Sequence, residues 1–452
     1  MKKLSKQAKK SRLYFFIEAL GCPKNLVEAE IISGAMISHG YGISFVPEEA
    51  DVCIITTCGF LPSARSEAAD SIAGGVTWKA QSPKRKLVVA GCLLNHADID
   101  KFKAHFPEVD LWVPVNDTAR IADLLAGETA HGDKDGITFL ADETMPRLQF
   151  TLPHVAYLKI SDGCNNRCSY CAIPELRGAL RSRNIAGIVK EARQLIANGV
   201  KELVVIAQDL TAFGQDAPER NENAAMLLKE LDALDGEFFL RLLYTHPAHY
   251  TDEFIDVIAN GKHILPYLDM PLQHINDRIL AAMNRHIDRA GIEELLTKLR
   301  ARIPGLVLRT TFITGLPGES DAEFDELYEF AKKWKFDRFG VFSFAPEPGT
   351  PAAGMPDQIP AEVADARAKK LLKSQIERMK RAQKKLIGTT VTAIFDYVDD
   401  ESGYGIARGA ADAPDIDNVI YFVPDDDLAP GDVLNIRITG VSGTDLTGVI
   451  EL

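Results

Sequence analysis

The feature that most limits the fold of this chain is a sixfold alternation of strand-like and helix-like segments between Val155 and Phe344. The strand-like segments are short runs rich in aliphatic and aromatic residues: Val155–Ile160, Glu202–Ala207, Phe239–Tyr244, Ile264–Met270, Leu306–Phe312 and Arg338–Phe344. The segments between them carry apolar residues at helical spacing, as in Ile185–Asn198, Ala224–Leu234, Gly291–Ile303 and Asp321–Trp334. An alternation of this kind predicts a parallel β-sheet covered by helices. Six such units predict an open partial barrel, with its chemistry on the loops at the carboxyl ends of the strands.

Three cysteines follow the first of these strands in one loop, with the spacing C-x3-C-x2-C: Cys164, Cys168 and Cys171. A structural zinc site normally uses four protein ligands, often as two C-x2-C pairs. Three thiolates this close together, with no fourth thiol nearby, instead favour a [4Fe–4S] cluster, in which each cysteine holds one iron and the fourth iron binds a ligand that is not protein. The alternatives are a zinc loop that lacks one ligand, or three unconnected thiols.

A second set of three cysteines lies in the N-terminal part of the chain. Strand-like runs at Tyr14–Ala19, Asp51–Thr57 and Lys86–Ala90, with a fourth at Leu111–Pro114, alternate with helical segments and predict a parallel α/β domain. One cysteine stands just past each of the first three strands: Cys22, Cys58 and Cys92. Because the carboxyl ends of parallel strands share one edge of a sheet, these thiols can converge although they are far apart in sequence. The alternative is that they are ordinary buried thiols.

The seventh cysteine has a different position. Cys53 lies in the middle of the second strand, between Val52 and Ile54, and we interpret it as a small buried hydrophobic residue.

Polar residues also stand at the ends of the strands of the central segment. Singly, each is explained by turn chemistry, and the run GLPGES is not a phosphate loop because it lacks the lysine of that motif. Together they line one mouth of the predicted barrel: Gln208-Asp209, Thr245-His246-Pro247, Leu272-Gln273-His274, Thr314 to Glu319, and Pro346 to Gly349.

The C-terminal part reads differently. A helical run covers residues 361–385, and from Gly388 short alternating strands predict a small antiparallel barrel: Val391–Tyr397, Val419–Val423 and Val433–Thr439. At about 150 residues per domain, 452 residues suggest about three domains. We place them at residues 11–127, at 149–385 including the C-terminal linking helix, and at 387–452.

Charge and hydropathy restrict the function. The net charge of −13 argues against a general nucleic-acid binder. Residues 387–452 alone contain thirteen acidic and two basic residues, so this barrel should repel phosphate and attract a basic partner, unless its charge serves only solubility. The apolar stretch Leu13 to Leu20 is broken by Glu18 and is too short for a signal or membrane-spanning segment. We therefore expect the cytoplasm, where seven cysteines are more plausibly metal ligands than disulfides.

Sequence segments around both sets of cysteines resemble a known family. AYLKISDGC, CAIPELRGALRSR, MPLQHIND and TTFITGLPGES in the central part, and GCPKNLVEAE, TTCGF and AGCL in the N-terminal part, resemble radical S-adenosylmethionine (SAM) methylthiotransferases of the RimO type. The C-terminal barrel resembles a TRAM domain. The G-x-I-x-G-x-x-E pattern of radical SAM enzymes is only partly kept, with Thr311 in place of its first glycine and Glu319 one residue late.

The resemblance implies an activity and its cofactors. The enzyme would add a methylthio group to the β-carbon of an aspartate of small-subunit ribosomal protein number twelve, in two SAM-dependent steps that need a reduced electron donor. One [4Fe–4S] cluster, on Cys164, Cys168 and Cys171, would act with SAM to generate a 5′-deoxyadenosyl radical. An auxiliary [4Fe–4S] cluster would be held by Cys22, Cys58 and Cys92. No catalytic side chain is assigned; the SAM contacts implied are Tyr170, Gln208, Arg309, Thr311 and Ile313.

Two other functions are compatible with these motifs. The first is a tRNA methylthiotransferase of the same fold, which the acidic barrel disfavours because its charge would repel the phosphates of RNA. The second is a non-catalytic iron–sulfur scaffold that docks on ribosomes.

Overall fold

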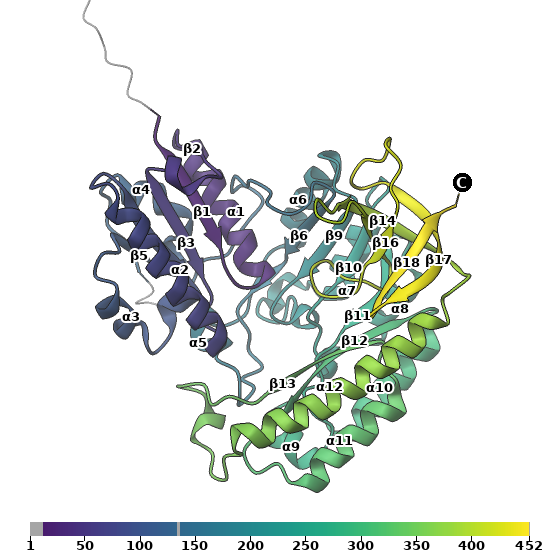
Figure 1. Cartoon of the computed structure of the whole chain (residues 1–452). Coiled ribbons are helices and arrows are strands. Elements are labelled where there is room, and N and C mark those ends of the chain that lie inside the picture. Colours follow the sequence, from purple (N-terminus) through teal and green to yellow (C-terminus); the bar gives the residue numbers. More distant parts are fainter. Residues whose placement is uncertain (1–11, 133–135, 452) are drawn as a thin grey trace, which may run out of the picture. The chain divides into compact units, whose positions relative to one another are not determined.

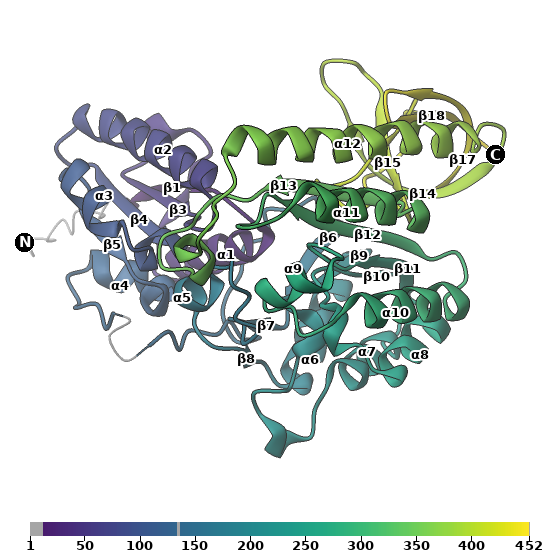
Figure 2. The same cartoon turned by 90° about the horizontal axis from the view of Figure 1, so that it is seen from below.

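The computed structural model describes residues 12–132 and 136–451 of the chain (Figures 1 and 2). Two compact units are distinguished. The first comprises the chain up to Phe150 together with Glu175–Gly178, and the second comprises Thr151–Pro174 and the chain from Ala179 onward. Ser11 and Leu452, the outer ends of the predicted first and third domains, lie outside the described residues.

The first unit is built on a parallel sheet with the strand order β2-β1-β3-β4-β5. Its strands are β1 (Tyr14–Ala19), β2 (Gly42–Ile43), β3 (Val52–Thr57), β4 (Lys86–Gly91) and β5 (Leu111–Val113). Helices cover both faces: α1 (Pro23–Ser38) and α4 (Ile121–Leu125) pack on one face, and α2 (Pro62–Ala80) and α3 (Ile99–His105) on the other. The predicted parallel α/β fold is confirmed, although the two-residue edge strand β2 is too short to leave a sequence pattern.

The second unit contains an open parallel sheet whose strand order, β13-β12-β11-β10-β9-β6, follows the order of the sequence (Figure 1). Its strands are β6 (Val155–Lys159), β9 (Glu202–Ile206), β10 (Phe239–Leu242), β11 (Ile264–Asp269), β12 (Val307–Thr314) and β13 (Arg338–Ser343). The connecting helices are α6 (Ile185–Ala197), α7 (Ala224–Asp232), α8 (Asp252–Asn260), α9 (Asp277–Ala282), α10 (Arg289–Arg302) and α11 (Asp321–Trp334). All neighbouring strands pair in parallel, so the predicted open barrel of six strands is confirmed.

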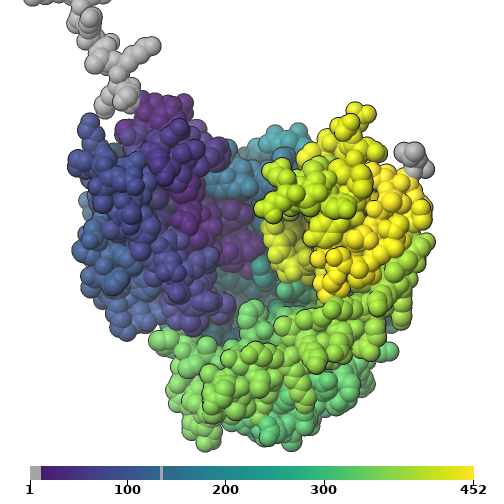
Figure 3. Space-filling model, viewed as in Figure 1, coloured from purple at the N-terminus to yellow at the C-terminus, as the bar shows by residue number. Residues whose placement is uncertain are grey.

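The C-terminal strands form a closed five-stranded barrel with the order β14-β15-β16-β18-β17, which follows helix α12 (Ala361–Lys384). In the space-filling view of Figure 3 this C-terminal part of the chain is yellow. The strands are β14 (Thr390–Val398), β15 (Gly405–Gly409), β16 (Ile420–Phe422), β17 (Val433–Ser442) and β18 (Asp445–Ile450). The sequence did not predict β15 or β18. Strand β15, with the sequence GIARG, contains two glycines and an arginine and lacks apolar–polar alternation. One pairing, β16 with β18, is parallel.

Buried ion pairs fasten this barrel to the amino end of the central sheet. Arg408 of β15 donates to Glu202 at the start of β9 (2.7 Å) and to Asp396 of β14 (2.6 Å). Arg241 of β10 donates to the other oxygen of Glu202 (2.6 Å), and His154, just before β6, lies 2.8 Å from Asp396. The barrel thus covers the amino end of the sheet and leaves the carboxyl edge to the polar loops.

Within the described ranges, the helices include none that combines the length and the apolar character needed to cross a membrane.

Candidate functional site

The first cysteine triad, Cys22, Cys58 and Cys92, lies at the carboxyl edge of the three central strands of the first unit. Cys22 caps the amino end of α1 after β1, Cys58 follows β3, and Cys92 opens the 3-10 turn after β4. Strands β1, β3 and β4 are direct neighbours, and Cys22 and Cys58 are close enough to Cys92 to raise the pKa of its thiol. The predicted convergence of the three side chains is therefore confirmed.

Two glycines allow this close approach. Gly91, before Cys92, has a φ of +104°, and a Cβ atom there would lie 2.5 Å from the carbonyl oxygen of Thr57. Gly21, before Cys22, has a φ of +94°, and a Cβ atom there would lie 2.8 Å from the Cβ of Cys58. Side chains at either position would meet both backbone strain and a steric clash.

A buried arginine contacts the first triad. The Nε of Arg177 donates to the Sγ of Cys92 at 2.9 Å, and the same guanidinium donates to Glu28 and to Asn25 Oδ1. Asn25 in turn donates to the carbonyl oxygens of Leu20 (3.1 Å) and Thr57 (3.0 Å), at the ends of β1 and β3. Arg177 is not among the site residues predicted from the sequence, although it lies within the segment CAIPELRGALRSR that carries the family resemblance.

Burial controls the protonation of these thiols. It raises the pKa of Cys92 to about 12, against the opposing charge of Arg177, and it also raises the pKa of Cys58. A metal bound here would displace the thiol protons, because cysteine binds metals as the thiolate. Buried, mutually close sulfurs beside a cation suit an anionic iron–sulfur cluster, because hydrogen bonds and positive charge stabilise it in a low-dielectric setting.

The second triad lies in a single loop after β6. Neighbouring segments hold this loop: the N–H of Ser169 donates to Met283 O (3.0 Å), and the N–H of Ala352 donates to Ser169 O (2.8 Å). Asn284 Nδ2 donates to the carbonyl oxygens of Asn166 and Arg167 (3.2 and 3.0 Å). The loop is thus positioned by the segment after α9 as well as by its own strand.

Burial and the neighbouring sulfurs also raise the pKa values of thiols in the second triad. Burial is the main cause that raises the pKa of Cys164 to about 11 and that of Cys171 to about 12, and the nearby sulfur of Cys168 contributes to both shifts. Arg285, 4% exposed, donates from Nη1 to Cys168 Sγ (3.4 Å) and to the hydroxyl of Tyr170 (3.4 Å). Its Nη2 donates to the carbonyl oxygen of Pro271. As at the first triad, a buried guanidinium contacts one sulfur.

The carboxyl edge of the central sheet carries polar atoms that lack a hydrogen-bond partner. Among the described residues, these buried atoms include Ser169 Oγ, Gln208 Oε1, His246 Nε2, Gln273 Oε1 and Arg285 Nε. They come from the cysteine loop, from the loops after β9, β10 and β11, and from the segment after α9. Buried polar atoms without partners cost free energy, so a set of this kind fits a ligand with its own donors and acceptors. The amine, carboxylate and ribose of SAM meet that requirement.

Backbone strain concentrates at the same edge. Five of the nine described non-glycine residues with positive φ are in these loops: Arg167, Tyr244, Gln273, Asn284 and His286. Strained backbone of this kind is maintained by its surroundings and clusters at functional sites.

The residues predicted to contact SAM have different surroundings. Tyr170 and Ile313 pack on one apolar cluster with Leu316 and Met283, beside the cysteine loop. Gln208 donates from Nε2 to Asp162 Oδ1 (2.7 Å), which leaves its Oε1 for a ligand.

The other two residues lie on β12. Thr311 is on the same face of this strand as Arg309 and Ile313, and its carbonyl oxygen accepts the N–H of Gln273 (2.8 Å). Arg309 donates to Asp269 (2.8 Å) and lies 3.7 Å from Asp417 of the barrel, so its guanidinium already serves two carboxylates. The assignment of all five residues to SAM stays a prediction.

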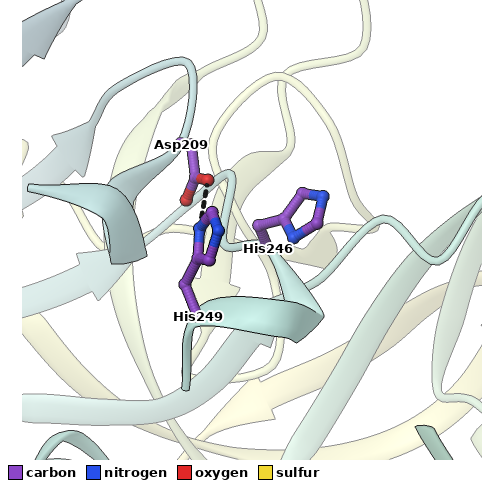
Figure 4. A group of neighbouring side chains, drawn as sticks. All are labelled: Asp209, His246 and His249. Carbon is purple, nitrogen blue, oxygen red and sulfur yellow. Dashed lines mark hydrogen bonds and ion pairs between the residues drawn. The ribbon is translucent and has the colours of Figure 1, made fainter. Parts of the chain in front are cut away.

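Asp209, His246 and His249 form a further cluster, with a ligand atom of each within 4.8 Å of the others (Figure 4). Asp209 already accepts four hydrogen bonds, from Asn166 Nδ2, Thr211 Oγ1, the N–H of Ala212 and His249 Nδ1. Burial opposes its ionisation, but the hydrogen bonds from His249 and Thr211 outweigh burial and lower its pKa to about 2. With these bonds in place, the carboxylate links the cysteine loop to the loops after β9 and β10.

The imidazole of His246 has a separate role in this cluster. Burial lowers the pKa of His246 to about 2, so the ring is neutral, and its Nδ1 accepts the N–H of Ala248 (3.3 Å). The ring proton is therefore on Nε2, which is one of the buried donors without a partner. We interpret the cluster as a hydrogen-bonded support with one donor left for a ligand.

The fold and the cysteine loop define a radical SAM enzyme. Residues 158–331 match the model of the radical SAM superfamily, residues 14–114 match the uncharacterized protein family UPF0004, and residues 387–450 match the TRAM domain. The radical SAM methyltransferase TsrM from Kitasatospora setae, solved with tryptophan and a SAM analogue, is similar in fold. Its TM-score is 0.57 at 13% identity, with 86% of this chain and 79% of that chain covered.

Comparison with curated proteins gives the family. The chain is 41% identical to the ribosomal protein uS12 methylthiotransferase RimO of Geotalea uraniireducens, over 96% of this chain and 97% of that protein. It is 40% identical to the RimO protein of Geobacter sulfurreducens, with the same coverage. The chain belongs to the RimO family of radical SAM methylthiotransferases.

Proposed function

We propose that this enzyme adds a methylthio group to the β-carbon of an aspartate of ribosomal protein uS12. The observation that carries the proposal is the convergence of the first triad, Cys22, Cys58 and Cys92, in addition to the triad of the cysteine loop, in a chain whose RimO relatives are about 40% identical over almost its full length. Radical SAM chemistry alone needs one cluster, so a second built site fits an enzyme that must also deliver sulfur.

Each triad would hold one [4Fe–4S] cluster. Cys164, Cys168 and Cys171 would hold the cluster whose open iron binds SAM, and Cys22, Cys58 and Cys92 would hold the auxiliary cluster. The bound cluster and SAM supply the radical needed to break an unactivated C–H bond, which side chains cannot supply.

The residues of the chain orient and shield these groups. Asn284, Met283 and Ala352 fix the cysteine loop through hydrogen bonds with its backbone, and the apolar cluster around Tyr170 excludes water from one side of it. The buried donors His246 Nε2 and Arg285 Nε and the acceptor Gln208 Oε1 would orient the polar ends of SAM or of the substrate aspartate. Holding reacting groups in place is the main contribution that such polar residues make.

The C-terminal barrel would bind the basic ribosomal protein and not RNA. Of its two basic residues, Arg408 is buried between Glu202 and Asp396, and Arg437 pairs with Glu451 (3.1 Å). Strand pairing brings two acidic clusters to the same end of the barrel, because Val398 pairs with Gly405 and Gly405 pairs with Phe422. The clusters are residues 399–401 and 425–427, and exposed Tyr404 and Val423 lie next to them.

Reversal of a whole acidic cluster tests this docking surface. Single exposed ion pairs contribute about 0–1 kcal/mol, so the full-length variant with Asp425, Asp426 and Asp427 all changed to Lys is needed. We expect slower association with uS12, most clearly at low salt, and unchanged SAM cleavage without substrate. Tighter binding of the parent enzyme to tRNA than to uS12, or unchanged association after reversal, would exclude the protein-docking role.

The substrate itself is tested in cells that lack this chain. Mass spectrometry of uS12 should reveal the loss of one methylthio group from an aspartate, while tRNA modifications remain unchanged. Loss of a methylthio group from tRNA instead would assign the tRNA-acting alternative. An anaerobically reconstituted, reduced enzyme should also cleave SAM to 5′-deoxyadenosine, which a non-catalytic scaffold would not do.

A further inference from the structure

Each cysteine triad has one buried arginine against one of its sulfurs, and neither arginine has a role in the function proposed above beyond general orientation. Arg177 is 1% exposed and its Nε lies 2.9 Å from Cys92 Sγ. Arg285 is 4% exposed and its Nη1 lies 3.4 Å from Cys168 Sγ. Arginine is rarely buried to this extent without a specific partner.

The contact of Arg177 is built from several elements of the first unit. Arg177 lies in Glu175–Gly178, the segment that belongs to the first unit although it follows Cys171 closely in sequence. Glu28 of α1, 2% exposed, forms an ion pair with its guanidinium, and Asn25 accepts a further hydrogen bond. These two partners orient the guanidinium so that Nε–H is directed at Cys92.

A hydrogen bond to a cluster sulfur has a known electrostatic effect. Reduction adds negative charge to a cluster, and hydrogen bonds to its sulfurs together with nearby positive charge stabilise the reduced state and raise its reduction potential. The effect is large where water is excluded, because the effective dielectric constant is low. Cys92 is 5% exposed, so the Arg177 contact lies in such an environment.

We propose that Arg177 is a positioning residue for the auxiliary cluster: it holds Cys92 in place and raises the reduction potential of that cluster. This inference rests on the auxiliary cluster of the proposed function. The competing explanation is that Arg177 only neutralises Glu28, in which case its removal would destabilise the unit and leave the potential unchanged.

The test uses the full-length protein with Cys164, Cys168 and Cys171 changed to Ala, so that only the auxiliary cluster remains. Iron is counted after anaerobic reconstitution, and the midpoint potential is measured by redox titration monitored by electron paramagnetic resonance. In R177M we expect the equilibrium constant for one-electron reduction to fall at least tenfold, which is a shift of about 59 mV to more negative potential. R177K, which keeps a charge but loses the Nε–H geometry, should shift less, in the same direction.

Two further variants separate tuning from charge balance. E28Q removes the negative charge that offsets Arg177. The midpoint potential of the auxiliary cluster in E28Q should therefore be higher than in the parent. R177M combined with E28Q removes the buried charge pair and should still show the negative shift, because the hydrogen bond to sulfur is lost. The matched control is R147M, which breaks another largely buried pair of the same unit, Arg147 with Glu30 (2.6 Å), and should leave the potential unchanged.

The outcomes are distinguishable. If the parent triple variant binds no iron, the auxiliary cluster of the proposed function fails, and the inference fails with it. If the parent binds about four iron atoms and R177M and R177K keep the parental potential, the proposed function stands and the tuning role of Arg177 is wrong. The tuning role is also wrong if R147M shifts the potential as much as R177M does. If R177M is folded by circular dichroism but has lost its iron, the measurement on R177K takes its place. A cluster in R177K with a more negative potential supports the tuning role of Arg177, and a cluster with the parental potential overturns it.

Discussion

The two cysteine triads each bring three thiols together, but they assemble them in opposite ways. The second triad lies within the eight residues from Cys164 to Cys171, so one loop supplies every thiol. The first triad joins Cys22, Cys58 and Cys92, which are 36 and 34 residues apart, through three neighbouring parallel strands. The first site therefore depends on the register of a whole sheet, whereas the second depends on how one loop is held.

The arginines extend this comparison. Arg177 is compensated by Glu28, whereas in the part of the chain that the structure describes no carboxylate oxygen lies within 4.0 Å of the Arg285 guanidinium. The cluster proposed at the second triad would thus experience a less compensated positive charge. This difference suits a site that binds the carboxylate of SAM.

The largest expected effect comes from removing either triad. The reconstituted enzyme should hold about eight iron atoms, and changing the three cysteines of one triad to Ala should leave about four, because each site is built independently. Loss of the second triad should abolish SAM cleavage to 5′-deoxyadenosine. Loss of the first should preserve that cleavage and abolish methylthio transfer. Removal of all iron by either triple change would contradict the two-site interpretation.

The next largest effect is expected from changing one glycine of the first site, which should affect that site and not the second. Gly91→Ala places a Cβ 2.5 Å from Thr57 O at a φ of +104°, and strain of this kind costs about 1–3 kcal/mol. We expect the variant to lose iron from the first site and keep the four iron atoms of the second. Gly40→Ala is the matched control, because Gly40 has a φ of +91° with nothing within 4 Å of an added Cβ. Equal iron loss in both variants would mean that the sheet register is not what forms the site.

These effects also mark what the sequence can and cannot predict. Both triads and all six central strands were predicted, because cysteine spacing and strand–helix alternation are local patterns. Arg177 and Arg285 were not, since an arginine in a polar segment looks like a surface residue until the fold buries it against a sulfur. Strand β15 was missed because closure of the barrel, rather than apolar alternation, makes GIARG a strand. The six cysteines as iron ligands, and the domain boundaries, stay predictions.

Changing Arg285 should have a moderate effect confined to the second site. Arg285→Met removes the donor to Cys168 and Tyr170, and a charged hydrogen bond of this kind contributes about 1.5–3 kcal/mol. We expect reductive SAM cleavage to slow about 10- to 100-fold, with the iron of the first site unchanged. Arg285→Lys should restore part of the rate. A normal rate in Arg285→Met would limit Arg285 to a packing role.

The smallest effect is expected at Cys53, the thiol that belongs to neither triad. It lies in β3, only five residues before Cys58, but its side chain packs with Ile55, Ile72 and Leu87 on the α2 face of the sheet, away from the carboxyl edge. Burial raises the pKa of its thiol to about 12, which is consistent with a neutral apolar role. Cys53→Ala should therefore lower the free energy of unfolding by only about 1 kcal/mol and leave about eight iron atoms and full activity. Loss of about four iron atoms in this variant would mean that Cys53, and not a strand-end thiol, is the ligand, and the carboxyl edge of the sheet would then not be the metal site of the first unit.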